Sequence, residues 1–177
     1  MDSNTNAKVS RFENLAVYFL LAAASVLSSL ALLRPGFIQG HDLPFQLTLV
    51  AEYASCLGQG VFPVRWAPHL EAGYGNPMFI FSPPLFPLVA SVWALLSGGQ
   101  LLIGIKAALL ILKFIGLLGM YRLSGVFFGK KSGLVSALFF AFAPYVAIDL
   151  FTRDAFQEFA GLCLIPWVFY SMARILT

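Results

Sequence analysis

The chain has 177 residues, of which 59% are hydrophobic and only 11% are charged, and its mean hydropathy is +0.83. A soluble domain is nearer half apolar and a quarter charged, so a soluble fold of this size could not cover so much apolar surface. The net charge of +3 comes from basic residues that mostly stand singly, which argues against nucleic acid as a partner. The two cysteines, Cys56 and Cys163, form neither a disulfide framework nor a metal knuckle. We therefore expect an all-α, multi-pass integral protein of the cytoplasmic (inner) membrane.

Four apolar segments are long enough to cross about 30 Å of hydrocarbon at about 1.5 Å per residue. They cover residues 15–33, 101–123, 133–150 and 159–176. The first follows Lys8 and Arg11 as a secretory signal would, but it is too long for a signal core and lacks a convincing cleavage site. We expect an uncleaved first helix, and we treat residues 1–177 as a single membrane module.

Residues 83–100 form a fifth apolar segment that starts with Pro83, Pro84 and Pro87. Only about ten helical residues can follow these prolines, which suits an interfacial or re-entrant segment better than a span. Charge bias agrees, because a segment that does not cross leaves six basic residues inside and three outside, with the N-terminus cytoplasmic. The inner set is Lys8, Arg11, Arg122, Lys130, Lys131 and Arg174, and the outer set is Arg34, Arg65 and Arg153.

The same topology places six of the eight acidic residues on the outer face: Asp42, Glu52, Glu71, Asp149, Asp154 and Glu158. A face rich in carboxylates and backed by lipid suits an active site for a membrane-borne substrate. The alternative is that acids simply tolerate the outer side, since they contribute little to orientation.

The long extracytoplasmic loop, residues 34–82, is cut by prolines and glycines into short pieces. Between the breaks, residues 45–57 predict an amphipathic helix, which would lie in the membrane interface. Its apolar side would carry Phe45, Leu49 and Tyr53, with Gln46, Glu52 and Gln59 off that side. A loop this long is usually functional or disordered, and its many aromatic residues disfavour disorder.

The motifs of this loop follow one another in a specific order. Gly-His-Asp at 40–42 precedes Arg-Trp-Ala-Pro at 65–68, Gly-Tyr-Gly-Asn-Pro at 73–77 and Ser-Pro-Pro-Leu at 82–85. A later stretch combines Pro144-Tyr145, Asp149, Arg153, Ala155 and Glu158, followed by Pro166. This series resembles GT-C-type membrane glycosyltransferases, most closely the bacterial and archaeal membrane proteins named, misleadingly, after 6-pyruvoyl-tetrahydropterin synthase.

The resemblance covers most of residues 35–170, with two departures. Asp154 stands where those proteins usually have Gly, and Gln46 stands where a His often follows the first acid. Such enzymes are also usually several times longer. The resemblance therefore implies that this chain is an N-terminal portion that works with a C-terminal part or with other chains.

The resemblance implies transfer of a sugar from a polyprenyl-phosphate-type donor, with membrane lipid around it, at the outer face. Asp42 is the candidate base for the acceptor's proton, and its alternative role is to cap the following helix. Arg153 and Lys106 are candidates for the donor phosphate, although Lys106 could instead extend to the interface. Lys113 lies too deep for that and is expected to pair with an acid or to face a cavity.

Asp149, Asp154 and Glu158 form a second acidic site, in which Asp154 and Glu158 are expected to share a helical face. With Asp42, the latter two could hold a divalent cation such as Mg or Mn through oxygen ligands. The alternative is that Arg153 only neutralises Asp149, four residues earlier. The remaining candidates form the loop motif, which consists of His41, Arg65, Trp66, His69, Glu71 and Tyr74, and two of its members, His41 and His69, offer another metal set with Glu71.

Two other functions compete with the enzyme. One is a non-catalytic membrane scaffold or lipid-carrier-binding subunit with the same fold. The other is a transporter, because Lys106 and Lys113 in one helix could line a polar path, although no inverted repeat is visible.

Overall fold

The computed structural model describes residues 3–36 and 40–176, with the backbone alone for residues 3–13. The side chains of the predicted cytoplasmic residues Lys8 and Arg11, part of the predicted loop at 37–39 and the final residue lie outside what is described. Helices account for every regular element of the described residues. They are α1 (Ser3–Leu27), η1 (Leu30–Leu33), α2 (Leu43–Gly58), η2 (Glu71–Gly73), α3 (Met78–Phe81), α4 (Leu85–Leu96), α5 (Leu101–Ala141), α6 (Pro144–Ile148), η3 (Asp149–Arg153) and α7 (Phe156–Leu176).

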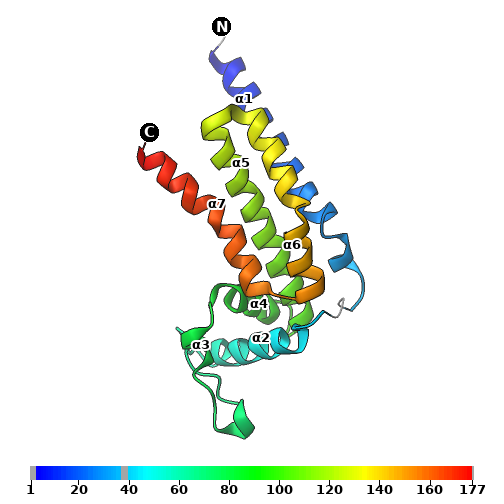
Figure 1. Cartoon of the computed structure of the whole chain (residues 1–177), viewed down its shortest axis with the longest axis vertical. Coiled ribbons are helices and arrows are strands. Elements are labelled where there is room, and N and C mark those ends of the chain that lie inside the picture. The colour runs from blue at the N-terminus through cyan, green and yellow to red at the C-terminus, as the bar shows by residue number, and fades with distance from the viewer. Residues whose placement is uncertain (1–2, 37–39, 177) are drawn as a thin grey trace.

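Long helices run side by side along the longest axis of the molecule (Figure 1). α5 is a helical hairpin rather than one rod, because its chain turns back at Gly129, which has φ 83° and ψ 170°. That conformation is open to glycine and strained for other residues. The turn falls between the predicted helices 101–123 and 133–150, so the two limbs of α5 correspond to them.

α2, α3 and α4 lie at one end of the molecule, and the start of α1 and the end of α7 lie at the other (Figure 1). α2 and α4 pack against each other at this end, which we call the loop end, and α4 also packs on the start of α5. The proline-led segment therefore begins and finishes at the loop end. α2 covers the predicted helix 45–57, with Pro44 in its first turn, but Phe45 of the predicted apolar side is 47% exposed.

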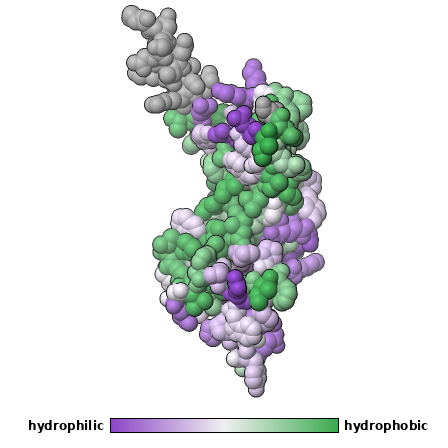
Figure 2. Space-filling model, turned by 90° about the vertical axis from the view of Figure 1, so that its left-hand side faces the viewer, coloured by the Kyte–Doolittle hydropathy of each residue, from purple (hydrophilic) through white to green (hydrophobic). Residues whose placement is uncertain are grey.

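Two helical stretches of the described chain are long and apolar enough to cross a membrane: Leu101–Arg153, which Gly129 divides, and α7. Hydrophobic residues cover much of the middle of the face shown in Figure 2, and hydrophilic residues gather towards its ends. Large apolar side chains stay exposed on α7, among them Val168 and Phe169 at 57% and 54%. This surface suits membrane association.

The predicted helix limits are wrong in two places. The first helix ends at Leu27 and continues as the separate turn η1, and the segment predicted as 133–150 breaks after Ala141. Pro144 accounts for the second break, since proline favours a helix start and disfavours helical backbone before it.

Small residues set the distance between the helices. Gly116 and Gly119 of α5 face Cys163 and Trp167 of α7, and an added Cβ would stand 3.0 Å and 2.7 Å from them. Gly104 meets α4 in the same way, because its Cβ would collide with the carbonyl oxygen of Ala90. Close backbone approach at small residues is how helices associate where lipid removes the hydrophobic drive.

The substitution Gly104→Ala is expected to lower the midpoint of thermal unfolding in detergent micelles. A backbone atom of α4 blocks the new methyl group, so α4 and α5 must separate at a cost of about 1–3 kcal/mol. Gly161→Ala in α7 is the control, because nothing lies within 4 Å of its Cβ and alanine favours helix. Equal midpoints for the two variants would show that the α4–α5 contact is not tight.

Candidate functional site

The segment before α2 is hydrogen-bonded to the segment before α7. Gly40 N–H donates to Asp154 Oδ2 at 2.8 Å, and the next two amides donate to the carbonyls of Thr152 and Arg153 at 3.0 and 3.1 Å. A Cβ on Gly40 would stand 2.6 Å from Asp154 Oδ2, so this approach requires glycine. The contact joins residues 114 positions apart and brings the Gly-His-Asp motif to the second acidic stretch.

Asp154 is the buried centre of this contact. It has no exposed surface, and its backbone is left-handed, with φ 55° and ψ 37°. Asp tolerates that region better than most residues. Burial raises the pKa of the Asp154 carboxyl, and the Gly40 N–H opposes the shift only in part. Oδ1 is buried and makes no hydrogen bond to the part of the chain that the structure describes.

Asp42 lies beside Asp154, as the charge of Asp42 contributes to the raised pKa of the Asp154 carboxyl. It occupies the position before α2, but its side chain makes no capping hydrogen bond. The exposed carboxylate of Asp42 is therefore not used as a cap, and it faces solvent next to a buried acid.

Arg153 is held by an ion-pair network. Its Nη1 donates to Asp149 Oδ1 at 2.8 Å, and its Nη2 pairs with Glu158 Oε2 at 2.8 Å. Tyr145 Oη accepts from Arg153 Nη1 at 3.2 Å and bonds to Glu158 Oε1. The local pair with Asp149, foreseen as an alternative, is thus present together with a second carboxylate, and this guanidinium is neutralised within the chain.

The second acidic site does not form one cluster. Asp154 is fully buried, whereas Glu158 is exposed and bound to Arg153 and Tyr145. The expectation that the two acids share a helical face is wrong, because Asp154 precedes α7 and its left-handed backbone turns it away from the helix. In the described chain no three His, Cys, Asp or Glu side chains are placed to hold a metal ion. The residues do not fit the expected Mg or Mn site, so we derive no step through a metal.

The two lysines of α5 are engaged near the end of α1. Lys106 Nζ donates to the carbonyl oxygen of Arg34 at 2.7 Å. Lys113 is 1% exposed, and its Nζ donates to Ser29 Oγ at 3.0 Å and to the carbonyl of Ser28 at 3.3 Å. The expectation that Lys113 pairs with an acid or faces a cavity is therefore wrong, since a serine and a backbone carbonyl bind its ammonium.

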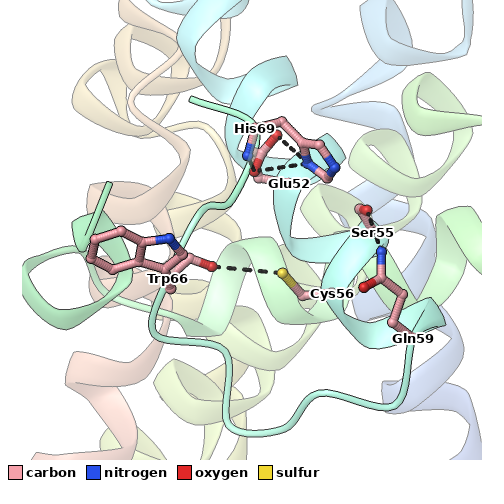
Figure 3. Close-up of polar contacts among 6 residues, drawn as sticks. All are labelled: Glu52, Ser55, Cys56, Gln59, Trp66 and His69. Carbon is pink, nitrogen blue, oxygen red and sulfur yellow. Dashed lines mark hydrogen bonds and ion pairs between the residues drawn. The ribbon is translucent and has the colours of Figure 1, made fainter. Parts of the chain in front are cut away.

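Residues 59–77, between α2 and α3, form a segment that we call the aromatic loop. The buried carboxylate of Glu52 holds this loop on α2 (Figure 3). Glu52 accepts from the backbone N–H of His69 at 3.1 Å and contacts its Nδ1 at 3.1 Å. Cys56 Sγ–H donates to the carbonyl of Trp66 at 3.6 Å one turn later. Gln46 and Glu52, expected off the apolar side of this helix, are both buried. Helical periodicity could not reveal these contacts, because the partners come from the loop.

The rest of the loop motif stays on the surface. His41, Arg65 and Glu71 are exposed, Trp66 is half-exposed and Tyr74 is 88% exposed. The three candidate metal ligands His41, His69 and Glu71 are not placed to hold a metal ion in the described structure.

An apolar groove of about 410 Å³ lies between the loop and α4. Apolar side chains from α2, the loop, α3 and α4 line it, with Arg65 as its charged residue: Tyr53, Phe62, Val64, Phe79, Leu85 and Leu88. The sequence pattern had marked Arg65 and the aromatic loop but not their association with α4.

The described chain is all-helical, and two of its helical stretches are long and apolar enough to span a membrane. No protein-family model matches the chain, and neither a curated protein nor a solved structure matches it significantly.

The buried Asp154 carboxyl makes stability depend on pH. Its pKa is raised above 3.8, so the folded chain binds more protons than the unfolded chain between 3.8 and the raised value. The free energy of unfolding therefore falls as pH rises through that window. In Asp154→Asn, thermal unfolding in micelles should lose the part of this fall that Asp154 contributes, while the amide oxygen still accepts from Gly40.

Glu71→Gln serves as the control, since Glu71 is an exposed acid of the same end of the molecule. It should unfold with the pH dependence of the unaltered chain. An Asp154→Asn profile that still falls as steeply would mean that Asp154 is not the titrating group.

Proposed function

We propose that this chain is the membrane-embedded N-terminal part of a GT-C-like glycosyltransferase. In this proposal its loop end faces the outer side of the cytoplasmic membrane, and a sugar passes there from a polyprenyl-phosphate-type donor to an acceptor. The observation that carries the proposal is the docking of residues 40–42 on residues 152–154, which sets exposed Asp42 beside buried Asp154.

Asp42 is the proposed general base, which takes the proton from the acceptor hydroxyl as it attacks the sugar. Its backbone N–H donates to the carbonyl oxygen of Arg153, which fixes the backbone from which the exposed carboxylate projects. Burial disfavours a charge on Asp154, whereas Asp42 is exposed to solvent, where an acceptor hydroxyl could reach it.

The proposed donor site is the groove between the aromatic loop and α4. The apolar walls of the groove suit a polyprenyl chain. Arg65 also lines the groove and is the proposed cation for the donor phosphate. Arg153 and Lys106, the cations first expected to bind phosphate, already have partners within the chain.

A non-catalytic subunit that binds the lipid carrier is the second candidate. The ion pairs of Arg153 favour this non-catalytic role. A transferase must offset the charge on the departing phosphate, and the charge of Arg153 is already neutralised by Asp149 and Glu158. No observation favours a transporter, since both lysines are hydrogen-bonded within the chain. Lys106 donates to Arg34, after η1, and Lys113 donates to Ser28 and Ser29, between α1 and η1.

Cysteine labelling tests the shared orientation of the two segments. Cys56 and Cys163 are buried, so Glu71→Cys and Thr152→Cys would each introduce one exposed thiol at the loop end. In intact cells both should react with a membrane-impermeant maleimide, and Lys131→Cys, at the α5 turn, should react only after permeabilisation. Labelling of positions 71 and 152 in opposite compartments would falsify the proposed site.

Asp42→Asn tests the base. In proteoliposomes with a polyprenyl-phosphate sugar and a set of hydroxyl acceptors, transfer should fall about 10²- to 10⁴-fold, the usual contribution of a general base. Donor binding, measured as the retention of radiolabelled donor, should stay unchanged.

Glu71→Gln is the matched control, because it removes an exposed acid at the loop end and should keep full transfer. Full transfer by Asp42→Asn would contradict the catalytic proposal. Donor binding without transfer in the unaltered chain would favour the non-catalytic subunit.

A further inference from the structure

A polar cleft of about 270 Å³ lies at the other end of the molecule, between α1, α5 and α7. We call it the tyrosine cleft. Its polar side chains are Asn14, Tyr18, Tyr121, Arg122, Lys130 and Tyr170. Its volume is close to the lower limit for small-ligand sites. Every polar group in this set can donate a hydrogen bond, and two of them are cations.

Arg122 is held in place from both neighbouring helices. Its Nη2 donates to Tyr18 Oη of α1 at 2.8 Å, and it is also hydrogen-bonded to Tyr170 of α7. A guanidinium has five N–H donors, so two hydroxyl partners leave donors for a ligand. A planar donor set fixed in this way suits the oxygens of a phosphate.

Lys130 reaches the same cleft from the far side of the α5 turn, directly after Gly129. The turn is closely packed, because a Cβ on Gly133 would stand 2.5 Å from the carbonyl oxygen of Tyr121. Among the residues whose side chains the structure describes, no acid lines the cleft and neither cation forms an ion pair. Two cations that line one cleft favour an anion between them.

We propose that the tyrosine cleft binds a phosphate group, namely the head group of an anionic phospholipid. The apolar lengths of α5 and α7 place this end at head-group depth if they span the bilayer, and exposed Phe127 and Phe128 lie at the same turn. Basic pockets between membrane helices are a known way to hold anionic head groups. The site is independent of the proposed transfer reaction, which uses the opposite end.

The test uses the full chain in nanodiscs that contain equal amounts of phosphatidylglycerol and phosphatidylcholine. The chain is released from the nanodiscs, and native mass spectrometry counts the lipids that stay bound to it. The unaltered chain should retain phosphatidylglycerol in preference, and Arg122→Gln or Lys130→Gln should each reduce that preference about fivefold. Lys130→Gln is the safer variant, because Lys130 is exposed and substitution should not disturb folding.

Lys131→Gln is the matched control, since it removes the adjacent charge but does not line the cleft. A second arm titrates inorganic phosphate into nanodiscs of phosphatidylcholine alone, to identify a soluble phosphate as the source. Binding in either arm that depends on Lys130 and not on Lys131 supports a phosphate site. No preference in either arm, or equal losses for Lys130→Gln and Lys131→Gln, would overturn it.

Discussion

The loop end depends on one buried carboxylate and the three hydrogen bonds around it. Asp154 accepts the Gly40 N–H without any exposure to water, and the two following amides bond to the chain just before it. A buried carboxyl is costly unless it is bonded or protonated, so this contact is specific rather than adaptable. Because it joins the start of α2 to the start of α7, it fixes where the loop motif lies relative to the helices.

The long helices are joined by a different kind of contact. Glycines of α5 let α4 and α7 approach closely, and Lys113 joins α5 to the end of α1 through Ser28 and Ser29. An ammonium that is 1% exposed needs such acceptors, and the turn between α1 and η1 supplies them here. Polar and small residues thus join these helices in addition to the apolar side chains that they bury together.

The sequence predicted what depends on local pattern. The proline-led start of α4, the existence of helix α2 and the break near Gly129 follow from residue types within one or two turns. The sequence could not predict that Glu52 is buried, because its partner His69 comes from the loop. It also could not predict that Asp154 and Glu158 lie in different environments, because Asp154 binds Gly40 and Glu158 binds Tyr145, both far away in the chain. The candidate site was therefore predicted by residue and not by geometry.

The two ends of the molecule treat their cations in opposite ways, and this difference decides what each end can bind. At the loop end, Asp149 and Glu158 neutralise Arg153, and Arg65 is the charged residue that lines the apolar groove of the proposed donor site. At the other end, tyrosine hydroxyls rather than carboxylates position Arg122. A hydroxyl orients a guanidinium without cancelling its charge, so the tyrosine cleft keeps the field that an anion needs. The proposed anion site thus lies at the end opposite to Asp149 and Glu158. It is separate from the proposed transfer reaction at the loop end.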